Sequence, residues 1–209
     1  MILPYPYPRL GGTSFRLRPF REDDFDATLA YSRDEATARW VPPLPADDPK
    51  SVVELFQRYR EDGQLLHLVI ADLTGDAYLG EVMVMVCDHQ MGELGCGLLP
   101  EARGRGIAAE ALSAFATWCA PNLKLQRLQV LVASDNRPAL ALAEHVGFRR
   151  EGVLRSYWDH DGDRFDAVML SMLPAEVGCS DLVSGSDSRS EIWTAEWESL
   201  GRATPSQTH

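Results

Sequence analysis

The stretch EARGRGIAAEAL, residues Glu101–Leu112, decides the fold of this sequence. Arg103 and Arg105 alternate with Gly104 and Gly106, and the apolar residues that follow repeat at helical spacing. A helix N-terminus has backbone N–H groups without intrahelical partners, so that it binds anions. It carries about half a positive charge and disfavours arginine. The stretch therefore predicts an anion site in which both arginines are partners of the anion; the alternative is an exposed turn without a ligand.

The elements around this stretch alternate between strand and helix patterns. Strands are expected at residues 14–20, 65–72, 77–86, 93–99 and 125–134, followed by a hairpin around Asp161-Gly162. Helices are expected at residues 21–40, 49–62, 107–119 and 136–146. The early strands can form an antiparallel meander, and the unit from Glu93 to Ser134 is long enough for a parallel crossover. The sequence thus predicts a mixed sheet flanked by helices.

Composition narrows the classes of protein. The 209 residues have a formal charge of −11, so the surface repels nucleic acid, which is not expected as a partner. No apolar run approaches the roughly 20 residues that span a bilayer, so no membrane partner is expected either. The four cysteines and five histidines have no metal-ligand spacing, so no metal is expected. The N-terminus lacks a signal-peptide pattern, which favours a cytoplasmic location.

A dinucleotide site is the first alternative for the glycine stretch. Residues 104–109 fit a relaxed G-x-G-x-x-A fingerprint, which requires an acidic residue about 20 positions later, at the end of the next strand. Position 126 is Gln126, and Asp135 comes too late. A doubly wound domain also needs more strand–helix alternation than this chain has. We therefore reject a dinucleotide fold.

A family resemblance rests on four landmarks that occur in order. Residues 103–108, RGRGIA, resemble the R/Q-x-x-G-x-G/A signature of the GNAT N-acetyltransferase superfamily, and residues 133–148, ASDNRPALALAEHVGF, resemble its next landmark. FRLRPFREDDFDA (15–27) and DGDRFDAVMLSML (161–173) look most like the Rim-type branch, whose namesakes acetylate ribosomal-protein N-termini. The resemblance implies an α/β (α+β) fold with a mostly antiparallel sheet of about seven strands, a splayed parallel pair and about four helices.

The resemblance also implies a cofactor site for acetyl-CoA. The glycine loop would hold the pyrophosphate, and the strand at Gly95 to Leu99, with a bulge at Gly97, would pair with the pantetheine arm. Asn136 would bind the cofactor arm, or cap the helix that follows it, or do both. The implied cofactor-binding residues are Leu98, Leu99, Arg103, Gly104, Arg105, Gly106, Ile107, Ala108 and Asn136.

The implied reaction is direct attack of an amine on the thioester. Glu93 and Glu81 are the candidate general bases, each with an ordinary strand residue as its alternative. A backbone N–H of Leu98 or Leu99 would stabilise the oxyanion. Rim-type relatives often place a serine where this chain has Ala139, so the acid for the leaving thiolate is Tyr157, a water molecule, or none.

The acceptor is expected between the loop after Trp40 and the final hairpin, with Trp40 and Trp158 lining its pocket. The sequence leaves open a protein N-terminus or a small-molecule amine as the acceptor, and it leaves open a homodimer. A different acyl group and an acyl-CoA sensor without turnover are the competing functions. Cys96 has no histidine placed to activate it and is interpreted as strand packing.

The expected acetyltransferase domain covers residues 1–174. The polar composition from residue 175 predicts a C-terminal linker over 175–209. Apolar residues at helical spacing near its end suggest a short amphipathic helix, with disorder as the alternative.

Overall fold

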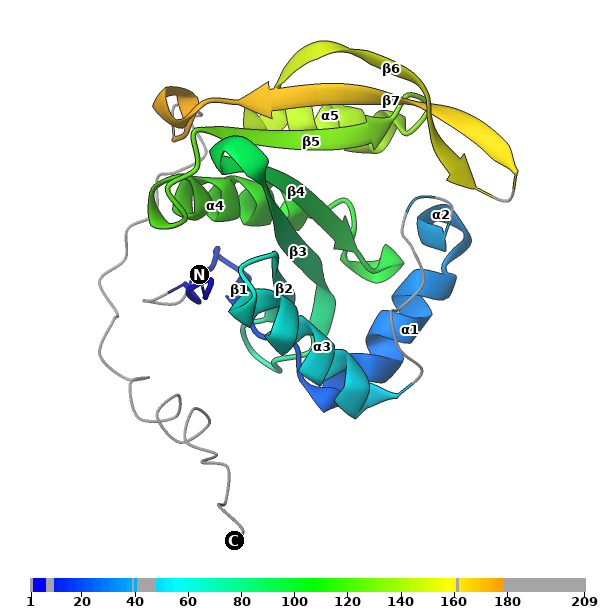
Figure 1. Cartoon of the computed structure of the whole chain (residues 1–209). Helices are drawn as coiled ribbons and strands as arrows, with labels where there is room; N and C mark the ends of the chain where they lie inside the picture. Colours follow the sequence, from blue (N-terminus) through cyan, green and yellow to red (C-terminus); the bar gives the residue numbers. More distant parts are fainter. Residues whose placement is uncertain (1, 7–9, 39, 41–47, 161, 179–209) are drawn as a thin grey trace, which may run out of the picture.

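The computed structural model describes residues 2–6, 10–38, 40, 48–160 and 162–178. The expected C-terminal linker and helix, the loop at residues 41–47 and Asp161 lie outside these residues, apart from the first four residues of the linker. The described chain forms a seven-stranded sheet in the order β1-β2-β3-β4-β5-β7-β6 (Figure 1). The strands are β1 (Phe15–Arg18), β2 (Leu65–Asp72), β3 (Tyr78–Cys87), β4 (Met91–Leu98), β5 (Arg127–Ala133), β6 (Arg149–His160) and β7 (Asp163–Met172).

The sheet is antiparallel except at its centre. Strands β1 to β4 form the expected meander, and β4 and β5 form the expected parallel pair. The pairing of β4 with β5 begins at Met91↔Arg127 and ends at Glu93↔Gln129, although β4 continues to Leu98. The second half of β4 therefore leaves its neighbour, and the sheet opens there (Figure 1).

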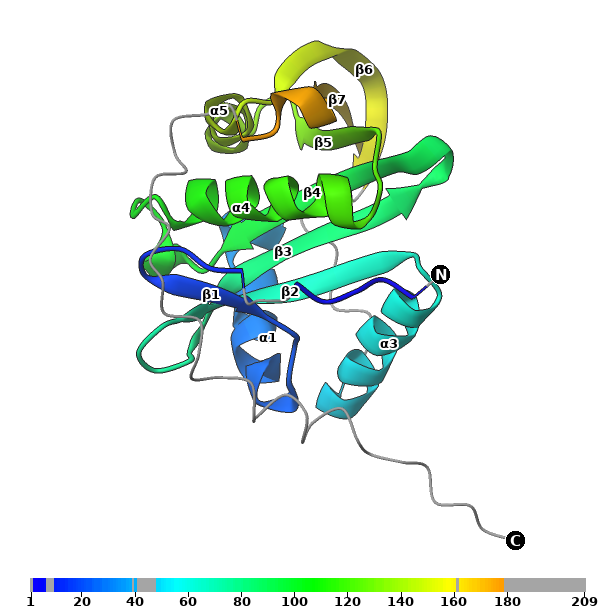
Figure 2. The ribbon, with the colours of Figure 1, turned by 90° about the vertical axis from the view of Figure 1, so that its left-hand side faces the viewer.

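Helices cover both faces of the sheet. On one face lie α4 (Ile107–Asn122) and α5 (Arg137–Val146), and on the other lie α1 (Phe25–Arg33) and α3 (Pro49–Glu61) (Figure 2). The buried side chains of α4 pack with those of β2, β3 and β5 in the larger core. A smaller core lies on the α1 and α3 face; its buried members are Phe20, Tyr31, Val52, Val69, Ala71, Tyr78 and Leu99.

The prediction of one continuous helix over residues 21–40 is wrong. Asp34 has ψ 124° and ends α1, and the short helix α2 (Glu35–Ala38) follows it. The Asp34 carboxylate accepts hydrogen bonds from the Thr37 N–H (3.1 Å) and hydroxyl (2.9 Å), as a capping residue does. The residues on both sides of Asp34 favour a helix, so the sequence did not reveal that Asp34 is a capping residue.

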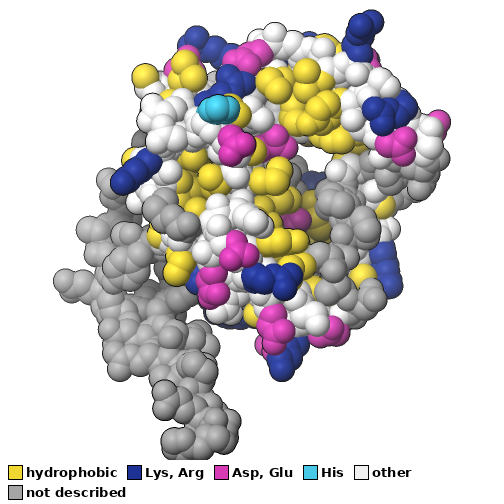
Figure 3. Space-filling view, in the orientation of Figure 1, with side chains coloured by type: hydrophobic (Ala, Val, Ile, Leu, Met, Phe, Trp, Pro, Cys, Tyr) yellow, Lys and Arg dark blue, Asp and Glu magenta, His cyan; other side chains and the backbone are white. Residues whose placement is uncertain are grey.

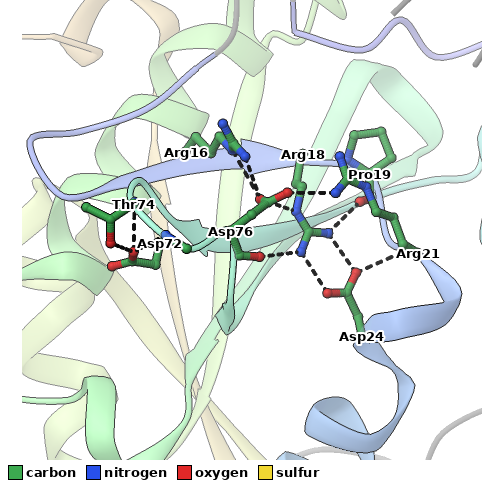
Figure 4. Close-up of polar contacts among 9 residues, drawn as sticks. Arg16, Arg18, Pro19, Arg21, Asp24, Asp72, Thr74 and Asp76 are labelled. Carbon is green, nitrogen blue, oxygen red and sulfur yellow. Dashed lines mark hydrogen bonds and ion pairs between the residues drawn. The ribbon is translucent and has the colours of Figure 1, made fainter. Parts of the chain in front are cut away.

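A buried ion-pair network fixes the start of α1. The guanidinium of Arg18 donates to both oxygens of Asp24 at 2.7 Å and to Asp76 at 2.8 Å, and Arg18 is 4% exposed (Figure 4). Arg16 and Arg21 also donate to Asp76, which lies in the turn between β2 and β3. The network joins β1, that turn and the residues that lead into α1.

Candidate active site

A cavity of about 1420 Å³ lies where β4 and β5 diverge. Figure 3 shows the surface hollowed between the part that carries β6 and β7 and the part that carries α1, with hydrophobic side chains around the hollow. The walls come from α1, β3, β4, the glycine loop, the N-terminal part of α4, β5, α5 and the β6–β7 hairpin. Ligand sites commonly have about 300–1,000 Å³, so this cavity has room for more than one small molecule.

The glycine loop has the geometry of an anion site. Gly104 (φ +72°) and Gly106 (φ +79°) are both in the left-handed region, which favours glycine. A Cβ atom at either position would meet no other atom within 4 Å, so the space beside the loop is open. The structure records no hydrogen bond between the N–H groups of residues 104–108 and any described residue, whereas those of Ala109 and Glu110 donate to the Gly106 carbonyl.

The two arginines of this loop differ from each other. The Arg103 guanidinium donates to the Leu98 carbonyl (3.0 Å), to Asp34 (2.9 Å) and to Thr37 (2.9 Å). Arg103 holds the pKa of the Asp34 carboxyl below its usual value through this hydrogen bond. The Arg103 side chain is thus held by Asp34 and Thr37, and its contact with a bound anion stays a prediction. Arg105 is exposed and forms no ion pair with a described residue.

The opening half of β4 presents backbone groups to the gap. The Leu99 N–H donates to the Leu79 carbonyl at 2.9 Å, on the β3 side. Because backbone groups alternate along an antiparallel pair, the N–H groups of Cys96 and Leu98 point away from β3, toward the gap. Of the two oxyanion candidates, Leu98 thus has an available N–H and lines the cavity, whereas the N–H of Leu99 is occupied.

The predicted bulge at Gly97 is wrong. The register of β3 with β4 continues without a shift from Cys87↔Met91 to Gly80↔Leu98. A Cβ atom at Gly97 would lie 1.7 Å from the hydroxyl oxygen of Tyr31, so the position needs glycine because this side chain approaches it. Tyr31 lines the cavity although no sequence pattern predicts a role for it there, because its buried position on α1 indicates only packing.

Glu81 is the buried carboxylate of the cavity wall. It is 6% exposed, and its Oε2 atom lies 2.9 Å from the His67 Nε2 atom and accepts from the Tyr78 hydroxyl at 3.2 Å. The His67 ring stacks on Phe56, with ring centroids 4.0 Å apart. These contacts hold the Glu81 carboxylate in one orientation.

The other oxygen of Glu81 is open to the cavity. The structure records no hydrogen bond from a described residue to Oε1. The fully buried polar side-chain atoms without a partner, in the described part of the chain, are Arg60 Nε and His67 Nδ1. Oε1 is not one of them, so it keeps access to the space that Glu81 lines.

The remaining candidates divide between the cavity and its surroundings. Glu93 accepts a hydrogen bond from Gln129 (3.0 Å) near the closed end of the β4–β5 pair and does not line the cavity in the described structure. Tyr157 is 46% exposed and lies outside the lining, next to Trp158, which lines it. Trp40 lines the cavity and packs edge-on against Phe165 of β7, with ring centroids 5.9 Å apart.

The far wall is formed by the start of α5. Asn136 caps this helix by accepting a hydrogen bond from the Ala139 N–H (3.2 Å), and both residues line the cavity. The cap is therefore confirmed. Cys96 lines the opposite wall, and desolvation, with a smaller contribution from Glu81, raises the pKa of its thiol to about 12. A thiol with this pKa is a poor nucleophile at neutral pH.

The described residues contain neither a candidate metal site nor a membrane-spanning helix. No group of three or more His, Cys, Asp or Glu side chains that could hold a metal ion occurs among them. No helix in the described part of the chain is long and apolar enough to cross a membrane.

Comparison with known proteins identifies the family. A model of the acetyltransferase (GNAT) domain matches residues 14–149. The uncharacterized N-acetyltransferase YoaA of Bacillus subtilis (strain 168) is 32% identical over 172 residues, which cover 80% of this chain and 97% of YoaA. The uncharacterized N-acetyltransferase p20 of Bacillus licheniformis is 26% identical over 165 residues, which cover 77% of this chain and 93% of p20.

Solved structures show the same fold. RimJ of Mycobacterium smegmatis, in complex with CoA-disulfide, matches with a TM-score of 0.72 and 23% identity, over 84% of this chain and 92% of RimJ. Spermidine N-acetyltransferase from Vibrio cholerae, in complex with CoA and spermine, matches with a TM-score of 0.67 and 22% identity, over 79% of this chain and 99% of that one.

The opened mixed sheet of this chain is a fold that it shares with these two solved structures. The chain belongs to the GNAT acetyltransferase family, and it is an N-acetyltransferase.

Proposed function

We propose that this enzyme transfers the acetyl group of acetyl-CoA to a primary amine by direct attack within a ternary complex. The observation that carries the proposal is the row of N–H groups at residues 104–108, which have no partner among the described residues and lie at the open end of β4. A pyrophosphate fits this row because the loop glycines leave the space beside it open. The names of the two solved neighbours supply CoA as the ligand class.

The gap between β4 and β5 suits an extended ligand arm. The gap-facing N–H group of Cys96 can pair with an amide group of the pantetheine chain, as a missing strand would. The Leu98 carbonyl already accepts from Arg103, and the Leu98 N–H remains available for the thioester oxygen. The Asn136 side-chain amide faces the same space from α5 while its oxygen caps the helix.

Glu81 is the proposed general base. It would remove a proton from the acceptor ammonium through Oε1, and Oε2 would stay bound to His67 and Tyr78. The free amine nitrogen then forms a bond with the carbonyl carbon of the thioester, and the oxyanion that results is stabilised by the Leu98 N–H. The carbon–sulfur bond breaks, and the second nitrogen proton passes to the leaving thiolate through water.

The departure of the thiolate needs no side-chain acid in this proposal. Ala139 has no hydroxyl, and Tyr157 lies outside the cavity lining. The thiolate of CoA is an acceptable leaving group, because a free thiol has a pKa near 8.5. The chemistry thus rests on the base, the oxyanion donor and the positions of the two substrates.

The acceptor would enter beside Trp40 and Trp158, below the β6–β7 hairpin. Asp159 and Glu81 add carboxylates to this side of the cavity, which favours a cationic amine over a neutral one. Both a protein N-terminus and a small polyamine satisfy this chemistry.

The test is release of free CoA thiol from acetyl-CoA in the presence of a panel of amines. The panel contains spermidine, a peptide with N-terminal alanine and an aminoglycoside. Turnover with one of them supports the proposal. Tight binding of acetyl-CoA without turnover of any acceptor would instead support an acyl-CoA sensor, and propionyl-CoA in parallel reports on acyl preference.

The loop assignment has its own test. Gly106→Trp should abolish acetyl-CoA binding in calorimetry, because its side chain fills the open space beside the loop and the left-handed backbone at φ +79° is strained with any side chain. The circular dichroism spectrum should stay close to that of the wild type, because the change is confined to the loop. Unchanged affinity would remove the loop from the binding site.

A further inference from the structure

The Tyr31 hydroxyl occupies a niche that Gly97 creates in β4. Tyr31 is 4% exposed and lines the cavity, and its hydroxyl oxygen lies where a side chain at position 97 would begin. The structure records no hydrogen bond from this hydroxyl to any described residue, and the hydroxyl is not among the fully buried orphans. A polar group open to the cavity, held by packing and lacking a partner, is a group that a ligand can satisfy.

The niche also brings Tyr31 beside Glu81. Glu81 and Gly97 are direct register partners on β3 and β4, so their side-chain positions share one face of the sheet. That face belongs to α1, whereas Cys96 points to the α4 face, where its thiol contacts the Ala108 carbonyl. The Tyr31 hydroxyl and the Glu81 Oε1 atom thus both face the cavity from the α1 side of the sheet. The helix that follows the glycine loop, α4, lies on the other side.

We propose that Tyr31 is a catalytic residue that binds the acceptor amine: its hydroxyl oxygen accepts one N–H of the amine while Glu81 takes the proton. This inference rests on the proposed amine acetylation. A hydrogen bond to Tyr31 fixes one N–H of the amine while Glu81 removes another proton. This restricts the orientations of the nitrogen and holds it close to the thioester carbon for the attack.

The electrostatics of the niche suit this role. Burial, followed by the negative charges of Glu81 and the Cys96 group, raises the pKa of the Tyr31 hydroxyl far above its usual value, and Arg103 opposes the shift. Tyr31 therefore stays a neutral phenol at all working pH values. It orients the amine and does not compete with Glu81 as a second base.

The first experiment compares Tyr31→Phe with a matched control, Tyr59→Phe. Tyr59 is a half-buried tyrosine of α3 that does not line the cavity in the described structure. With spermidine and the alanyl peptide as acceptors, Tyr31→Phe should lower kcat/KM for the acceptor by about 10- to 100-fold, the range for a lost hydrogen bond to a charged group. The dissociation constant for acetyl-CoA and the melting temperature should stay unchanged, because the hydroxyl has no hydrogen-bond partner among the described residues. The control should match the wild type.

A second experiment tests the niche itself. Gly97→Ala places a methyl group against the Tyr31 hydroxyl, and the ring carbon behind it would still be 2.7 Å away. The fold-loss in kcat/KM caused by Gly97→Ala should therefore be smaller in the Tyr31→Phe background than in the wild type. Equal losses in the two backgrounds would show that the hydroxyl does not occupy the niche, and would overturn the proposal.

Two further results would also overturn it. The first is kcat/KM within twofold of the wild type for Tyr31→Phe. The second is a tenfold weaker acetyl-CoA affinity with acceptor kinetics intact, which would place the hydroxyl on the cofactor. Failure of the proposed function looks different, because the wild-type enzyme itself would then release no CoA with any acceptor.

Discussion

The Glu81→Gln variant tests the proposed general base, because it should lower turnover without destabilising the fold. Glutamine has the same shape, and its amide oxygen can still accept from His67 Nε2 (2.9 Å) and from the Tyr78 hydroxyl (3.2 Å). The free energy of unfolding should therefore change little. The amide cannot take a proton, so kcat should fall by about 10²–10⁴-fold, the usual contribution of a general base. That fall corresponds to about 2.7–5.5 kcal/mol in activation free energy.

Glu81→Ala provides the structural comparison. It removes the acceptor of both donors, and each buried donor left without a partner costs about 1–3 kcal/mol. Urea unfolding should therefore distinguish the two variants, with Glu81→Ala clearly less stable. Both should lose turnover to a similar extent.

The assay is CoA thiol release at saturating acetyl-CoA, with calorimetry to confirm that cofactor affinity is unchanged. The deficit of Glu81→Gln should shrink as the pH rises toward the pKa of the acceptor amine, because the amine then arrives without its proton. A kcat/KM within threefold of the wild type would refute the assignment. If Glu93→Gln lost activity and Glu81→Gln did not, the general base would instead be Glu93 on β4.

Three further predictions concern the other groups described above. Arg18→Met should cost about 3–5 kcal/mol in urea unfolding, because it leaves buried carboxylate charge unpaired (Figure 4); a loss below 1 kcal/mol would contradict this. Cys96 should resist iodoacetamide at pH 8 in the native protein, since its pKa of about 12 keeps the thiol protonated; mass spectrometry that finds rapid alkylation would show otherwise. Arg127 and Ser171 lower the pKa of Glu151 to about 2, so its contribution to stability is complete above about pH 4.5 and is lost as the pH falls toward 2. Glu151→Gln should remove this component from the pH dependence of unfolding, and an unchanged acid limb would contradict it.

The order of strands and helices could be predicted because its signals are local. The apolar runs of β2 and β3 on either side of their turn, the Asp48 cap before Pro49 and the helix end at Gly147 each depend on neighbouring residues. The Asp48 carboxylate accepts from the Ser51 N–H at 3.0 Å, as the sequence pattern predicts. The same holds for the glycine loop, whose left-handed conformation needs glycine whatever surrounds it.

Part of the candidate site could not be predicted, because it depends on residues far apart in the chain. Arg103 binds Asp34, which is 69 positions earlier, and no local pattern predicts this partner. Gly97 was expected to mark a bulge, but the approach of Tyr31 is what requires it. Both a bulge and the close approach of another side chain favour glycine in a strand, so the sequence does not distinguish them. The packing of α1 on the sheet decides between them.

The sequence by itself determined the family, the mixed sheet and the anion-binding loop, since periodicity, caps and positive-φ glycines act within a few residues. Only the tertiary structure decided which carboxylate faces the cavity. Glu81 and Glu93 are both strand glutamates, and alternation places them on the same face of the sheet. The register of β2 against β3 brings His67 to Glu81, and the packing of α1 brings Tyr31 there. Glu93 remains in the closed part of the sheet beside Gln129.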